Sequence, residues 1–176
     1  MSLLRIFRKI TRSIQLLLGL LCLMGGLSSA HALEKPSDVV VLTISGQISQ
    51  MNARKTAVFG MQMLSRLPQR TLFTKSPWYP AGAEFTGPLL RDVLKAVGAK
   101  GKTVTAYALN DYKTEIPLDD ATKYDVILAR LMNGKPMAVR DKGPLFVVYP
   151  FDAVPELQTQ LYYNRSAWQL TRLQID

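Results

Sequence analysis

The sequence is almost devoid of cysteine and histidine. Its 176 residues include one of each, Cys22 and His31, and both lie in the first 32 residues. Residues 33–176 therefore form no disulfide. They also provide no Cys nucleophile, no Ser-His-Asp triad and no Cys/His zinc site. We accordingly predict no catalytic residue and no metal ligand among them.

Acidic residues are absent from the first 32 residues, which contain four basic ones. The whole chain has a formal net charge of +9, and the part after Ala32 has 18 basic and 13 acidic residues, which leaves +5. The part after Ala32 contains no run of Lys or Arg of the kind that is typical of nucleic-acid binding. We therefore expect no nucleic-acid partner.

The N-terminal segment has the pattern of a secretory signal. Residues 1–12 are basic, 14–27 are mostly apolar, and Ala30-His31-Ala32 is a small-x-small cleavage signature. We predict a signal peptide over 1–32 and a periplasmic or secreted protein. The alternative is an uncleaved membrane anchor, but a span needs about 18–20 apolar residues. Arg8-Lys9 replaces the adjacent arginines of a twin-arginine signal, which favours the general secretory route.

Patterns of apolar residues predict a β-rich α+β domain with a few short helices over 33–176. Strands are expected at 39–44, 47–49, 70–74, 103–109, 125–132, 145–149 and 168–175. In the last strand, Leu170 is expected on one face and Leu173 and Ile175 on the other. Asn133-Gly134 predicts a hairpin with a type I′ turn, because that turn needs positive φ at both central residues.

Helices are expected within 52–67, over 88–97 with Pro88 in the first turn, and over 157–163. The first would place four apolar residues on one face: Phe59, Met63, Leu64 and Leu67. Residues 75–82 are rich in Pro, Gly and aromatics and predict a loop. Binding residues concentrate in such loops, although the aromatic residues Trp78 and Tyr79 could instead cover the edge of the core.

Several short motifs occur in an order that resembles the molybdopterin-binding domain of the sulfite-oxidase family. They are Phe85-Thr86-Gly87-Pro88-Leu89-Leu90, Asp111-Tyr112, Ile116-Pro117, Ile127-Leu128-Ala129, Asn133-Gly134-Lys135-Pro136-Met137, Gly143-Pro144-Leu145, Val147-Val148-Tyr149-Pro150 and Trp168-Gln169-Leu170. The resemblance covers most of the chain after Val39. It implies a single domain with the sulfite-oxidase-type molybdopterin-binding fold over 33–176.

The resemblance also implies a pterin cofactor whose molybdenum is bound by a cysteine thiolate. In this sequence the matching position is Thr74, whose hydroxyl is a harder and normally protonated ligand. An Arg that the family tends to have after Gly-Pro-Leu corresponds to Phe146, and the family's His residues have no counterpart. We therefore expect no cofactor, with molybdopterin as the alternative.

Polar and aromatic residues near the matched motifs are the candidate binding residues. They are Thr74, Trp78, Asp111, Tyr112, Asn133, Lys135, Arg140 and Lys142. The three basic residues near the Asn133-Gly134 turn could form an anion site, since Lys and Arg suit phosphate and carboxylate. The alternative is a solvated hairpin face. Asp119-Asp120 is expected to cap a turn rather than to bind metal.

These observations favour a non-catalytic binding or accessory module, a pseudoenzyme of the resembled family. It would deliver a small anion or a protein signal to a membrane or periplasmic protein partner, and would contact a membrane itself only through an uncleaved signal segment. Two alternatives remain. One is a molybdopterin-dependent oxidoreductase with a non-Cys metal site. The other is a purely structural or interaction protein.

Overall fold

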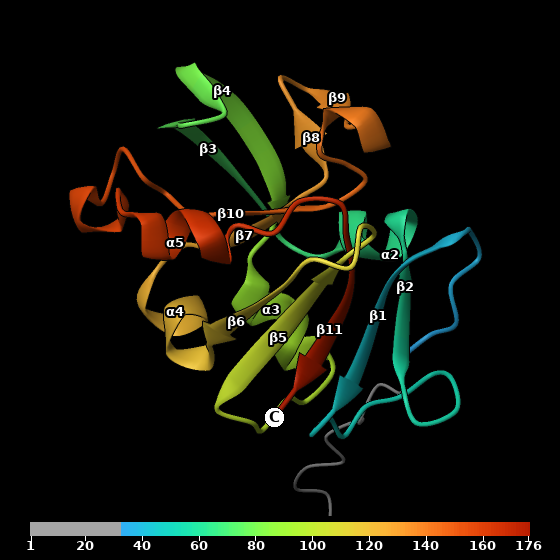
Figure 1. The fold of residues 1–176 in the computed structure, drawn as a ribbon. Coiled ribbons are helices and arrows are strands. Elements are labelled where there is room, and N and C mark those ends of the chain that lie inside the picture. Colours follow the sequence, from blue (N-terminus) through green and yellow to red (C-terminus); the bar gives the residue numbers. More distant parts are fainter. Residues whose placement is uncertain (1–32) are drawn as a thin grey trace, which may run out of the picture. The chain divides into compact units, whose positions relative to one another are not determined.

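The computed structural model describes residues 33–176, and the predicted signal peptide lies outside the described residues. The described chain is rich in strands and contains four short α-helices (Figure 1). This confirms the predicted α+β fold class. Within the same residues, no helix has the length and apolar character needed to cross a membrane.

A five-stranded sheet has the order β2-β1-β11-β5-β6. Its strands are β1 (Val40–Gly46), β2 (Ala57–Gly60), β5 (Thr103–Ala108), β6 (Lys113–Pro117) and β11 (Leu170–Ile175). β1 and β11 pair in parallel, and the other neighbours pair antiparallel. The last strand of the chain therefore lies beside the first strand in the middle of the sheet (Figure 1).

The remaining strands form a four-stranded sheet and a two-stranded sheet. The first has the order β3 (Gln69–Ser76), β4 (Tyr79–Pro88), β8 (Leu131–Met132) and β9 (Lys135–Pro136), and the second pairs β7 (Ile127–Ala129) with β10 (Phe146–Val148). Asn133 and Gly134 join β8 to β9 with φ of 49° and 73°, which confirms the predicted turn.

The predicted loop over 75–82 was wrong. β3 continues to Ser76, β4 begins at Tyr79, and a two-residue turn joins them. Pro80 is tolerated because it falls where the β3–β4 register shifts, between the Thr74↔Ala83 and Ser76↔Tyr79 pairs. Cross-strand pairing along the whole hairpin outweighs the local preference of Pro and Gly for loops.

The helices are shorter than expected. They are α2 (Met61–Arg66), α3 (Leu90–Ala96), α4 (Leu118–Lys123) and α5 (Gln160–Arg165). Phe59 belongs to β2, so the expected helical face beginning at Phe59 was wrong. Pro88 ends β4 instead of opening α3, and Leu157 ends a 3-10 turn before α5 begins. The sequence motifs gave no indication of β6 or α4.

Two strand predictions also need correction. Residues 47–49 form a turn, in which the amide of Ile48 donates to the carbonyl of Gly46. In β11, Leu170, Leu173 and Ile175 are all buried, because the register with β5 shifts between Leu170 and Arg172. A bulge of this kind brings residues of opposite parity onto one face.

The buried side chains form two clusters. The larger cluster includes inward-facing residues of the five-stranded sheet, such as Leu42 and Ile44, together with Val93 of α3. The smaller cluster includes Phe85 from the β3–β4 hairpin and Phe146 from β10. The smaller cluster supports the candidate site described next.

Candidate functional site

Thr74 and its neighbour Lys75 are joined to Asp152 by two hydrogen bonds. The side chain of Thr74 is on β3 and only 1% of the residue is exposed. Its Oγ1 accepts a hydrogen bond from the amide of Asp152 at 3.3 Å, and the carboxylate Oδ1 of Asp152 accepts one from the amide of Lys75 at 3.1 Å. The Thr74 hydroxyl also donates to the carbonyl of Lys75 at 3.3 Å. We call the two hydrogen bonds that join Thr74 and Lys75 to Asp152 the clamp.

Four aromatic residues pack beside the clamp, and we call Trp78, Phe146, Tyr163 and Trp168 the aromatic cluster. The ring of Trp78 makes edge contacts with the other three, at centroid distances of 5.1 Å to Trp168, 5.9 Å to Phe146 and 6.1 Å to Tyr163. Such T-shaped pairs contribute stability beyond the burial of their area. The cluster joins the β3–β4 turn to β10 and α5, which fixes these elements around the clamp.

Lys142 covers one side of the aromatic cluster. Its Nζ lies 4.0 Å from the ring centroid of Trp168 and 5.5 Å from that of Trp78. The ammonium is thus held by cation–π interactions, and it forms no ion pair with another described residue. Burial lowers the pKa of Lys142. Its carbonyl accepts a hydrogen bond from the amide of Gln169 at 2.9 Å, which holds the turn in place.

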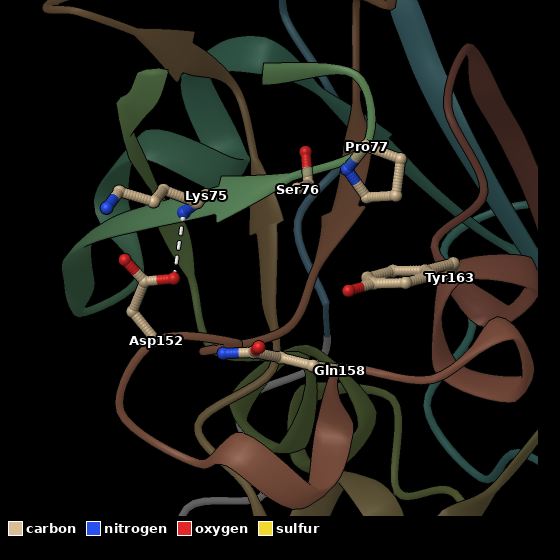
Figure 2. A pocket seen from close by; sticks show the side chains of 6 residues that line it. All are labelled: Lys75, Ser76, Pro77, Asp152, Gln158 and Tyr163. Carbon is tan, nitrogen blue, oxygen red and sulfur yellow. Dashed lines mark hydrogen bonds between the residues drawn. The ribbon is translucent and has the colours of Figure 1, made fainter. Parts of the chain in front are cut away.

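A cavity of about 450 Å³ opens next to the clamp (Figure 2). Its lining residues are Lys75, Ser76, Pro77, Asp152, Gln158 and Tyr163. In Figure 2 the Asp152 carboxylate and the Tyr163 ring stand on opposite sides of the space, and the Tyr163 hydroxyl points into it. Gln158 lies between them and donates from Nε2 to the carbonyl of Phe151 at 2.9 Å.

The structure places the eight predicted binding residues in separate regions. Thr74, Trp78 and Lys142 lie at the clamp and the aromatic cluster. Asp111 and Tyr112 lie in the β5–β6 connection, where the Tyr112 hydroxyl donates to the carbonyl of Asn164 at 2.7 Å.

Asn133 and Lys135 lie in the β8–β9 hairpin and line a second cavity of about 360 Å³. The side-chain Oδ1 of Asn133 accepts a hydrogen bond from the backbone amide of Glu84 at 3.0 Å. The Asn133 side chain therefore has a structural role in joining the hairpin to β4.

The three predicted anion-binding cations have different surroundings. Lys135 shares its cavity with Asp141, and Arg140 pairs with the same carboxylate at 3.5 Å. Lys142 instead lies over the tryptophan rings. An acid between two of the cations weakens the attraction of this region for an anion.

Sequence patterns missed Asp152, Gln158 and Tyr163, which complete the cavity. Asp152 follows shortly after β10, and the other two lie at or before α5. Each is an ordinary polar residue in a short connection or helix, and only the packing of α5 against the β3–β4 turn brings them together.

The sequence predicted that Asp120 caps a turn. In the structure it is instead the centre of a buried polar group. It is 7% exposed, and its Oδ2 accepts hydrogen bonds from the Tyr149 hydroxyl at 2.8 Å and from Nη1 of Arg165 at 2.9 Å. Burial, and then the adjacent carboxylate, raise the pKa of Tyr149. This group ties α4 and α5 to the segment after β10.

The residues at the matched positions do not fit a molybdenum–pterin centre of the kind that the resemblance implies. Such a centre uses a soft, deprotonated sulfur ligand. Thr74 offers a hydroxyl that is already engaged in the clamp, and Phe146 is an apolar side chain, 2% exposed, within the aromatic cluster. Among residues 33–176, no three His, Cys, Asp or Glu side chains gather as a metal site would require.

Comparison with known proteins shows similarity of two kinds. The family model described as the oxidoreductase molybdopterin binding domain matches residues 41–153. The crystal structure of the sulfane dehydrogenase SoxCD from Paracoccus pantotrophus is similar, with a TM-score of 0.55 and 23% identity. That similarity covers 76% of this chain and 37% of that chain, so it shows a shared fold over part of a longer protein. No curated protein matches the sequence.

Proposed function

Because the chain belongs to the oxidoreductase molybdopterin-binding domain family, we propose that it keeps the family's fold as a binding module and has lost the oxidoreductase chemistry. The module binds a small ligand, and a protein partner recognises the ligand-bound form. It works in the periplasm or outside the cell, in keeping with the predicted signal peptide over 1–32. The partner is a membrane or periplasmic protein.

The observation that carries this proposal is the environment of Thr74. A metal ligand must present a free lone pair in a position that the metal can reach. Thr74 is buried and uses its hydroxyl to hold Asp152 and the Lys75 carbonyl. Thr74 thus stands at the position of the family's thiolate ligand, and its hydroxyl is used within the clamp. This supports a fold that is retained for a purpose other than metal chemistry.

Thermal unfolding tests the proposal. The mature protein is isolated from the periplasm of hosts grown with and without molybdate, and the two unfolding midpoints are compared. A ligand that binds only the native state raises stability by mass action. The proposal predicts equal midpoints, since no molybdenum cofactor is bound. A higher midpoint for the molybdate-grown protein would contradict it.

A further inference from the structure

We propose that the cavity beside the clamp binds a neutral, hydroxyl-rich small molecule, such as a polyol or a monosaccharide. This inference rests on the proposed function, because it assigns a ligand to a module without a bound molybdenum–pterin. Three properties of the cavity support this ligand class: the charge of its lining residues, their hydrogen-bonding groups and the size of the space (Figure 2).

The charge of the lining residues favours a neutral ligand. Of the six lining residues, only Lys75 and Asp152 are charged, with opposite signs. A simple anion would meet the Asp152 carboxylate, and a simple cation would meet the field of Lys75. A neutral molecule avoids both penalties, which grow as water is displaced from the cavity.

The hydrogen-bonding groups that remain available favour a ligand with several hydroxyls. The clamp uses Oδ1 of Asp152 as an acceptor, and the second carboxylate oxygen bonds to no other residue of 33–176. Gln158 is fixed through Nε2, which leaves its Oε1 without a partner among the described residues. Both oxygens belong to residues that line the cavity, and as acceptors they require donors on the ligand.

Tyr163 adds both a hydroxyl and a ring face. The hydroxyl points into the space and makes no hydrogen bond with the rest of the described chain. The ring is held by contacts with Phe151 at 5.0 Å and Trp78 at 6.1 Å. A phenol can donate or accept, and its ring offers an apolar surface to the C–H face of a sugar. Because packing fixes the ring, little ordering is needed on binding.

The size of the cavity agrees with this ligand class. Small-molecule sites have volumes of roughly 300–1,000 Å³ and combine apolar surface with a few placed polar groups. At about 450 Å³, this cavity is at the lower end of that range. It would hold a single sugar ring or a short polyol together with water.

Intrinsic tryptophan fluorescence tests the proposal. The chain has two tryptophans, and both belong to the aromatic cluster that contains Tyr163. The mature protein is titrated separately with glucose, sorbitol and myo-inositol, and with putrescine and inorganic phosphate as charged comparators. We expect a saturable change of emission with at least one of the three hydroxyl compounds, and none with the comparators.

Two substitutions locate the binding. Asp152→Asn keeps the Oδ1 acceptor of the clamp but turns the second carboxylate oxygen into a donor, and Tyr163→Phe removes only the hydroxyl. Each should weaken binding by about tenfold, the effect of one lost hydrogen bond to a bound ligand. The matched controls Asp92→Asn in α3 and Tyr107→Phe in β5 alter the same residue types away from the cavity and should leave affinity unchanged.

Three results would overturn the inference. They are no saturable change with any hydroxyl compound, a change with putrescine or phosphate alone, and unaltered affinity in both cavity variants. Molybdenum content is measured on the same protein. Molybdenum-free protein that fails to bind the three compounds rejects this inference only, whereas stoichiometric molybdenum rejects the proposed function.

Discussion

At the scale of single residues, Thr74 is the position that bears most directly on whether a molybdenum cofactor can be bound. The sequence alone indicated a hydroxyl at the position where the resemblance implies a thiolate. The structure adds that this hydroxyl is buried and accepts a hydrogen bond from the amide of Asp152. Thr74 thus links β3 to the segment after β10.

Substitution Thr74→Val tests this structural role. Valine has the shape of threonine but leaves the Asp152 amide without its acceptor, so we expect a loss of about 1 kcal/mol in the free energy of unfolding. Urea denaturation gives this value. The control is Thr43→Val on β1, a partly exposed position whose hydroxyl makes no hydrogen bond within residues 33–176, where the change should be below about 0.5 kcal/mol. Equal losses in the two variants would contradict a special role for Thr74.

Tyr149 provides a prediction about pH. Burial, and then the Asp120 carboxylate, raise the pKa of Tyr149 above the ordinary value of 10.0. The unfolded chain therefore releases this proton near pH 10 while the folded chain retains it. Since the folded state then binds more protons, stability should fall as pH rises above about 10.

The pH dependence is measured as the free energy of unfolding of the wild type and of Tyr149→Phe. The variant lacks this titrating group, so its stability should decline less steeply above pH 10, although it loses the hydrogen bond to Asp120 at every pH. Parallel curves for the two proteins would show that Tyr149 titrates normally in the folded state.

At the scale of secondary-structure elements, glycine positions distinguish close packing from turn geometry. A Cβ on Gly87 of β4 would lie 1.9 Å from the carbonyl oxygen of Leu128 in β7. Gly134 in the β8–β9 turn has a φ of +73°, and a Cβ there would meet nothing within 4 Å. The two glycines are thus required for different physical reasons.

We predict that Gly87→Ala destabilises the protein much more than Gly134→Ala. The first forces two strands apart and should cost about 3 kcal/mol, while the second costs about 1 kcal/mol through backbone strain alone. Thermal or urea unfolding of both variants gives the comparison. If Gly134→Ala proved the more damaging, the close approach of β4 to β7 would be in doubt.

Elements could be predicted from the sequence where local signals are strong. The strand at β5 and the Asn133-Gly134 turn are encoded within a few neighbouring residues, and both were predicted, although the sequence did not indicate which face of β5 is buried. β6 and α4 have five and six residues, too few to show a period. The β11 bulge and the continuous β3–β4 hairpin depend on partner strands, so local patterns gave the wrong face and a loop.

At the scale of the whole molecule, the candidate site is assembled from distant parts of the chain. The clamp and the aromatic cluster bring together residues near 74–78, 142–152 and 163–168. The sequence could suggest Thr74, Trp78 and Lys142 because they lie near recognisable motifs. Asp152 and Tyr163 became candidates only when the fold placed them beside the β3–β4 turn.

Family membership is also a property of the whole molecule, because it is indicated by the order of many weak motifs along the chain. The family model matches residues 41–153, which include the clamp residues and two members of the aromatic cluster, Trp78 and Phe146. The fold is thus shared, while Thr74 and Phe146 replace the side chains that the resemblance associates with the cofactor. A shared fold with altered site residues is the basis for proposing a binding module.

The most direct test of this account is the molybdenum and pterin content of the protein. Mature protein is purified from the periplasm of a molybdate-replete host, its metal content is measured by mass spectrometry, and released pterin is measured by fluorescence. The account predicts neither component above background. Stoichiometric molybdenum and pterin would contradict it, and would make Thr74 the first residue to examine as part of a metal site.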